Sequence, residues 1–117
     1  MPDNKATMLR IFEVFSQDDL GPLDELLAED FVEHEELPPG IPQGREAPRT
    51  LMTMMRGAFP DFRAVVEELL QDGDKVVARV RLSGTHQGEF MGIPATGKRF
   101  DIAVIDIIEF REGKGVA

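Results

Sequence analysis

The apolar residues in the first half of the chain recur every three to four positions, which is the period of an amphipathic helix. Between residues 4 and 17 this stripe consists of Met8, Ile11, Phe12 and Phe15. The same spacing predicts a short helix over 22–28 and a longer one over 46–58. Between these two helices, residues 31–34 read as a short strand that ends at a proline-rich run.

After Pro60 the period changes to two, which predicts antiparallel strands. The expected strands cover 62–70, 75–86 and 99–111, with a hairpin turn at Gly73 between the first two. Helices followed by antiparallel strands are typical of an α+β fold, and a long twisted sheet over helices leaves a conical pocket between the layers. A chain of 117 residues has room for one core, so we expect a single domain over 1–117.

The composition of the chain limits the binding partners and the cellular location that we expect for the protein. A formal net charge of −9 disfavours nucleic acid and anionic membrane surfaces as partners. The sequence contains no cysteine, which excludes disulfides, thiolate nucleophiles and cysteine–zinc sites. It shows no signal peptide, and no apolar run approaches the roughly 20 residues that span a bilayer. We therefore expect a cytoplasmic protein.

The last predicted strand carries the sharpest chemical signal. Alternation places one charged residue, Asp106, on a face that is otherwise made of large apolar side chains: Phe100, Ile102, Val104, Ile108 and Phe110. A carboxyl group held neutral by an apolar wall can donate a hydrogen bond to a developing oxyanion or carry a proton. The alternatives are that Asp106 pairs with an arginine or faces solvent.

Two histidines are the other candidates for proton transfer. His34 ends the predicted strand 31–34 among neighbouring glutamates, and His86 ends the strand 75–86. Each can also be a structural or solvated residue. The spacings that hold metal ions, such as His-x-His and His-x-x-x-His, do not occur, so we expect no bound metal.

Residues 84–98, with the sequence Gly-Thr-His-Gln-Gly-Glu-Phe-Met-Gly-Ile-Pro-Ala-Thr-Gly-Lys, resemble the glycine-rich stretch of SnoaL-like polyketide cyclases. Segments at 23–34, 44–46 and 59–62 follow in the order expected of that family, so the resemblance covers nearly the whole chain. The resemblance implies the cone-shaped fold shared by nuclear transport factor 2 and ketosteroid isomerase. It also implies ring closure of a small apolar carbonyl compound by acid–base chemistry without a cofactor.

The resemblance also assigns roles to residues. Asp106 stands where the related isomerases place an oxyanion-stabilising aspartic acid, and His34 stands at the position of their general base. We expect a substrate pocket formed with His86, Phe12, Phe15, Met55, Phe59 and Phe90. The isomerases use a tyrosine from the first helix, whereas this sequence contains none.

The C-terminal residues also depart from the family pattern. Family members continue past Gly113-Lys114 into a further strand, so we expect the last strand of this sheet to be truncated. An uncovered sheet edge favours pairing with another subunit, which predicts a homodimer, with or without strand exchange. Two alternatives to a cyclase or isomerase remain: a non-catalytic binding or scaffold domain, and an epoxide hydrolase.

Overall fold

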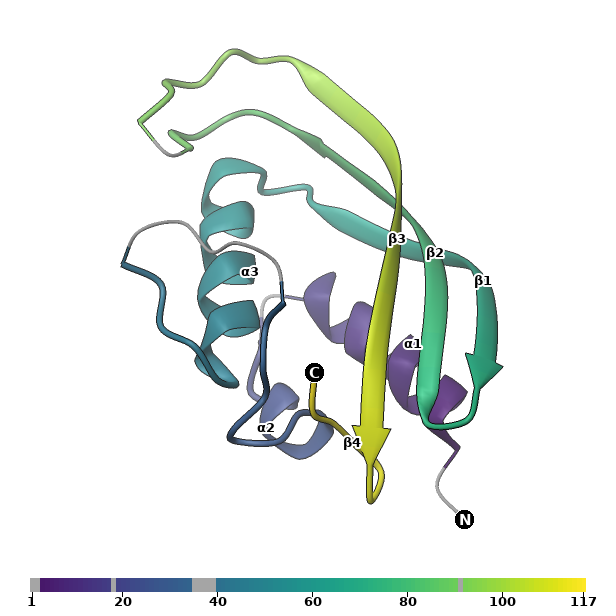
Figure 1. The fold of residues 1–117 in the computed structure, drawn as a ribbon. Coiled ribbons are helices and arrows are strands. Elements are labelled where there is room, and N and C mark those ends of the chain that lie inside the picture. The colour runs from purple at the N-terminus through teal and green to yellow at the C-terminus, as the bar shows by residue number, and fades with distance from the viewer. Residues whose placement is uncertain (1–2, 18, 35–39, 91) are drawn as a thin grey trace.

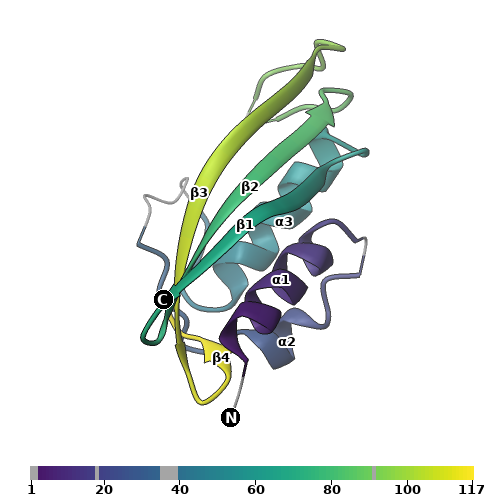
Figure 2. The same ribbon diagram turned by 90° about the vertical axis from the view of Figure 1, so that its right-hand side faces the viewer.

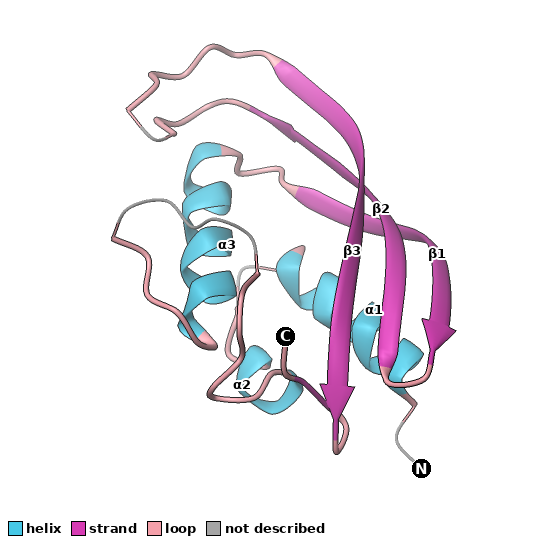
Figure 3. Ribbon diagram, in the orientation of Figure 1, coloured by secondary structure: helices cyan, strands magenta, loops and turns pink. Residues whose placement is uncertain are grey.

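The residues that the structure describes are 3–17, 19–34, 40–90 and 92–117. In this computed structural model they form three helices followed by a four-stranded antiparallel sheet (Figures 1 and 3). The helices are α1 (Asn4–Phe15), α2 (Leu23–Leu26) and α3 (Glu46–Ala58). The strands are β1 (Arg63–Asp72), β2 (Lys75–Thr85), β3 (Arg99–Arg111) and β4 (Lys114–Gly115), paired in the order β1-β2-β3-β4. The predicted α+β order is confirmed.

Tight two-residue hairpins connect β1 to β2 and β3 to β4. Gly73, with φ of 62°, lies in the two-residue turn between the paired residues Asp72 and Lys75, as the sequence predicts. In the hairpin from β3 to β4, both central residues, Glu112 and Gly113, have positive φ, which is the requirement of a type I′ turn. This turn brings the C-terminal residues back onto the end of β3.

The helices all lie on one face of the curved sheet, and the core is between the two layers (Figure 2). Periodicity explains this arrangement, because the predicted inward face of β3 is the better buried one and ends at Phe110, which is 2% exposed. The main buried cluster joins Met8 and Ile11 of α1 to Val76 and Val80 of β2. Of the residues that the structure describes, no helix covers the other face of the sheet, and Ile105 and Ile107 are exposed on it.

One prediction about strands needs correction. Residues 31–34 are not a strand, because no ladder forms there: the N–H of Val32 donates to the carbonyl of Val116, and the neighbouring bridge from Leu27 to Gly115 is isolated. The last strand, β4, is only two residues long. The residues after the last turn therefore pair both with β3 and with the segment that follows α2.

No helix within the described parts of the chain is both long enough and apolar enough to cross a membrane.

Candidate functional site

A large cavity lies between the helices and the inner face of the sheet. Its volume is about 1080 Å³, and its walls come from α1, α3, the segment 27–34, the strands β2 and β3, and the C-terminal residues. Most of the lining is aliphatic or aromatic. Pockets that bind small organic molecules have volumes of roughly 300–1,000 Å³ and mainly apolar walls, so this cavity has the size and character of a ligand site.

Asp106 lines this cavity from the middle of β3. Its side chain is half-buried, and its cross-strand partner on the same face is Ala78, which is fully buried. The neighbours on the same face of the strand, Val104 and Ile108, also line the cavity. The carboxyl group therefore borders a space with largely apolar walls, where it can donate or accept a proton next to a bound ligand.

His34 lines the same cavity, from the segment that follows α2, and its side chain is exposed. The backbone next to it is fixed by a side chain: Gln43 accepts from the N–H of Glu33 at 3.2 Å and donates its amide N–H to the carbonyl of Glu33 at 3.3 Å. Gln43 thus supplies both hydrogen bonds that a neighbouring strand would otherwise make. These two hydrogen bonds hold the backbone of the segment in the absence of a β ladder.

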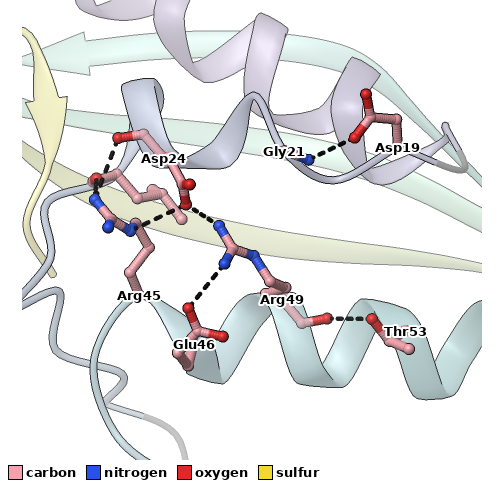
Figure 4. A network of polar contacts seen from close by, with 8 residues as sticks. Asp19, Gly21, Asp24, Arg45, Glu46, Arg49 and Thr53 are labelled. Atoms are coloured by element: carbon pink, nitrogen blue, oxygen red, sulfur yellow. Dashed lines mark hydrogen bonds and ion pairs between the residues drawn. The ribbon is translucent and has the colours of Figure 1, made fainter.

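A network of charged residues joins α2 to the start of α3 beside this segment (Figure 4). Asp24 of α2 forms two ion pairs through its Oδ1 atom. One is with Nε of Arg45 at 3.3 Å, and the other is with Arg49. Arg45 also donates to the backbone carbonyls of Asp24 and Leu27, at 3.2 and 3.4 Å, and Arg49 pairs with Glu46 at 2.8 Å. The backbone N–H of Arg45 donates to Glu29. These contacts attach α3 to the segment that carries the His34 wall of the cavity.

The residues predicted to bind substrate divide into two groups. Phe12, Phe15 and Met55 line the cavity, together with Asp106 and His34. The remaining three, His86, Phe59 and Phe90, are not among the residues that line it. They lie instead with Phe100 in an aromatic cluster around Phe59, whose ring centroid is 5.3 Å from His86, 5.6 Å from Phe90 and 5.0 Å from Phe100.

His86 is held in this cluster by the glycine-rich connection. Its Nδ1 is 3.0 Å from Oγ1 of Thr96, and its backbone exchanges hydrogen bonds with Lys98 and Gly97. The neighbouring N–H groups of Gln87 and Gly88 both donate to the carbonyl of Ala58 at the end of α3. These hydrogen bonds attach the glycine-rich connection between β2 and β3 to the end of α3. The glycine-rich motif therefore has a role in packing.

A carboxylate fixes the nearby ends of β1 and β2. Asp61 accepts from the backbone N–H of Thr85 at 2.7 Å and from its hydroxyl at 2.8 Å. These hydrogen bonds, with a smaller contribution from Arg99, lower the pKa of the Asp61 carboxyl because they favour its ionised form. This link was not predicted, since nothing in the sequence relates a residue before β1 to the end of β2.

The arginines of β2 lie on the outer face of the sheet. Arg79 is paired with Glu67 and Glu68, while Arg81 is paired with Glu67 and, at 2.7 Å, with Asp101. The contacts of Arg81 with Asp101, and to a smaller extent with Glu67, favour its charged form and raise its pKa. The relay of two carboxylates and an arginine that an epoxide hydrolase needs is therefore not built from these two arginines, because their ion pairs are on the face opposite to Asp106.

Several cavity residues were not singled out from the sequence. They are the apolar wall residues Leu51, Met52, Leu82, Val104 and Ile108. The signal for them was present, because Leu51 lies on the helical stripe that contains Met55, and Val104 and Ile108 share the face of Asp106. Among the described residues, no group of three or more His, Asp or Glu side chains is arranged to hold a metal ion.

Comparison with known proteins shows which family the chain belongs to. The profile of the SnoaL-like polyketide cyclase family matches residues 5–116. The aklanonic acid methyl ester cyclase DauD of Streptomyces sp. (strain C5) is 36% identical over 93 residues, which cover 73% of this chain and 57% of DauD. The chain thus spans less than two thirds of that relative's length.

Solved structures with the same fold include IdmH from Streptomyces antibioticus, with 35% identity and a TM-score of 0.81 over 97% of this chain and 87% of IdmH. A SnoaL-like protein from Jannaschia sp. CCS1 has 28% identity and a TM-score of 0.80, over 97% of this chain and 80% of its own. The chain belongs to the SnoaL-like polyketide cyclase family and has its NTF2-like fold.

Proposed function

We propose that this protein is a cyclase that closes a ring in a small, largely apolar carbonyl compound of the polyketide type by acid–base chemistry without a cofactor. The observation that carries the proposal is that Asp106 and His34 line one cavity with largely apolar walls. Family membership and the similarity to an aklanonic acid methyl ester cyclase support the reaction class.

The proposed reaction is an intramolecular aldol step. His34, as the base, removes a proton from the carbon next to a carbonyl group, and the resulting enolate attacks a second carbonyl of the same molecule. A new carbon–carbon bond forms, and the attacked carbonyl oxygen becomes an alkoxide. Asp106, as the acid, stabilises this oxygen and gives it a proton. One proton enters the protein and one leaves it, so the reaction needs no other reactant.

The cavity walls favour a flat apolar substrate. Leu51 and Met55 of α3 border the cavity on the helical side, and Leu82 and Val104 border it on the sheet side. Burial of apolar surface contributes about 25 cal/mol per Å², so walls of this kind bind an aromatic or alicyclic ring system mainly through its faces. The few polar groups orient its carbonyl oxygens. We also propose that the working form is a homodimer.

The proposal can be tested with aklanonic acid methyl ester as substrate, and product formation followed by liquid chromatography and mass spectrometry. The wild-type chain should form the ring-closed product, and Asp106→Asn should be slower by about 10²–10⁴-fold, the usual contribution of a general acid. Asp101→Asn is the matched control, because Asp101 is on the same strand but pairs with Arg81 on the outer face. It should retain the wild-type rate.

Two results would contradict the proposal. One is binding of the substrate by the wild-type chain without any turnover, which would indicate a non-catalytic binding domain. The other is an equal loss of rate in Asp106→Asn and Asp101→Asn, which would show that the loss does not come from the cavity.

A further inference from the structure

The loop formed by residues 40–45 is attached to the segment 27–34, which forms one wall of the cavity. The backbone N–H of Arg45 donates to the carbonyl of Glu29 at 3.1 Å. A Cβ atom at Gly44 would lie 3.1 Å from the same carbonyl oxygen, so the loop passes about as close to the segment as a glycine allows. These contacts fix the place along the segment at which the loop lies.

The two neighbours of Gln43 in this loop restrict its backbone. Pro42 has a φ that its ring holds at about −65°. Gly44 has a φ of 92°, a value that favours glycine. Between them, the side chain of Gln43 reaches the backbone of Glu33, where its amide accepts from the N–H at 3.2 Å and donates to the C=O at 3.3 Å. The loop therefore presents the Gln43 amide to Glu33 from a restricted backbone.

The carbonyl group that Gln43 holds belongs to the peptide unit between Glu33 and His34. A peptide unit is planar, so the C=O of Glu33 and the N–H of His34 turn together. The hydrogen bond that Gln43 donates to this carbonyl therefore restricts the rotation of the whole unit. The hydrogen bond that Gln43 accepts restricts the preceding unit in the same way. Together the two hydrogen bonds set the direction in which the His34 side chain leaves the backbone.

The imidazole ring of His34 depends on this backbone for its position. Its side chain is exposed and lines the cavity. In many enzymes a third group orients the side chain that acts as the base. Within the described ranges of the chain, no group forms a hydrogen bond with the His34 ring. The backbone of His34 therefore does the work that such a third group does elsewhere.

We propose that Gln43 is a positioning residue for the reaction. Its amide holds the peptide unit between Glu33 and His34, so that the imidazole of His34 reaches a substrate in the cavity. Gln43 carries no charge and is not among the residues that line the cavity, so it acts through His34 and not on the substrate. The inference rests on the proposed function in one respect: its effect on the rate requires that His34 be the base.

NMR relaxation tests the hold on the peptide unit without any measurement of turnover. The order parameter of the His34 backbone amide reports the motion of this unit, and a rigid backbone amide has a value of about 0.85. Gln43→Met keeps an unbranched side chain of similar length and removes both hydrogen bonds. We expect the order parameter of His34 to fall from about 0.85 to below about 0.6 in this variant.

Gln71→Met is the matched control. Gln71 is also an exposed glutamine whose amide donates to a backbone carbonyl, that of Gly73 at 3.0 Å. It lies near the end of β1 and is not among the residues that line the cavity. Its substitution should leave the order parameter of His34 unchanged. An order parameter of His34 that also stays unchanged in Gln43→Met would overturn the proposal.

Steady-state kinetics with aklanonic acid methyl ester tests the consequence for the reaction. Gln43→Met should lower kcat for ring closure by about tenfold or more, because a small displacement of a catalytic group is costly. KM should stay within about twofold, since the apolar walls that bind the substrate do not change. Both hydrogen bonds are exposed, so water replaces them and Tm should fall by less than about 3 °C. A rise in KM and a large fall in Tm beside the loss of kcat would indicate a general structural role and contradict the proposal.

A double variant with His34→Gln shows whether Gln43 acts through the histidine. Positioning predicts that Gln43→Met lowers kcat no further once His34 is replaced. The same fold-loss in both backgrounds would overturn the proposal, and so would a wild-type kcat in Gln43→Met alone. A wild-type kcat in His34→Gln alone would instead refute the proposed base. In that case the order parameter would still show whether Gln43 holds the His34 backbone, so the two failures are distinguishable.

Discussion

Gly88 provides a sensitive test of how the glycine-rich connection is attached to α3. A Cβ atom at this position would lie 2.4 Å from the carbonyl oxygen of Gly57 and 3.3 Å from the Cα of Ala58. Both neighbours are backbone atoms of the end of α3, which cannot rotate away as a side chain can. Gly88→Ala therefore forces the connection to move away from the helix.

The cost can be estimated from the contacts that the movement breaks. The N–H groups of Gln87 and Gly88 donate to the carbonyl of Ala58, at 2.9 and 3.0 Å. Each such hydrogen bond contributes about 0.5–1.5 kcal/mol to the free energy of unfolding, so loss of both lowers it by about 1–3 kcal/mol. At this chain length, 1 kcal/mol changes Tm by roughly 4 °C, which gives a decrease of about 4–12 °C.

Urea unfolding followed by far-UV circular dichroism measures this change, since the chain has no tryptophan for fluorescence. The matched control is Gly57→Ala in α3, where an added Cβ meets no atom within 4 Å. That substitution should raise the free energy of unfolding, by up to about 1 kcal/mol, through helix propensity. If Gly88→Ala were as stable as the wild type, the close packing of the connection against α3 would be refuted.

Two further substitutions test the core and the link between β1 and β2. Leu27→Ala should lower the free energy of unfolding by about 2–5 kcal/mol in urea titrations, because Leu27 is 1% exposed and its removal leaves a void; a loss below 1 kcal/mol would contradict this. Asp61→Asn should be less stable than the wild type at pH 7. Hydrogen bonds from Thr85 lower the pKa of the Asp61 carboxyl in the folded protein below its ordinary value of 3.8. The ionised carboxylate therefore contributes its full stabilisation of the fold above pH 3.8, and this contribution is lost as the pH falls through the lower pKa of the folded state. In thermal melts between pH 7 and pH 2, the Tm values of the wild type and of Asp61→Asn should converge as the pH falls. A Tm difference that grows toward acid pH would contradict the role of the ionised Asp61 carboxylate.

The local periodicity of apolar residues was sufficient to predict the main helices and strands of this fold. The apolar stripe around Leu51 and Met55 predicted the bounds of α3, and alternation predicted β3 over 99–111, as observed. Each of these elements has one strongly apolar face, so its burial follows from its own sequence. The same alternation identified Asp106 as the charged residue on the inward face of β3, and the structure places it at a cavity.

The features that were missed depend on residues far apart in the chain. The segment at His34 was predicted as a strand, but its hydrogen bonds come from the side chain of Gln43 and from Val116 near the C-terminus. The separation of Phe59 from the cavity depends on how the glycine-rich connection packs, which side-chain type alone does not specify. Sequence patterns report local preference, whereas these contacts are set by the tertiary fold.

If Asp106 and His34 act on the same substrate in one cavity, a double-mutant cycle in kcat/KM for ring closure will show it. Residues that act as a unit in one step have non-additive effects. We expect Asp106→Asn and His34→Gln each to lower kcat/KM by about 10²-fold or more, and the double variant to lose little beyond the more damaging single substitution. Losses that multiply in the double variant, or a single substitution that leaves kcat/KM unchanged, would contradict it.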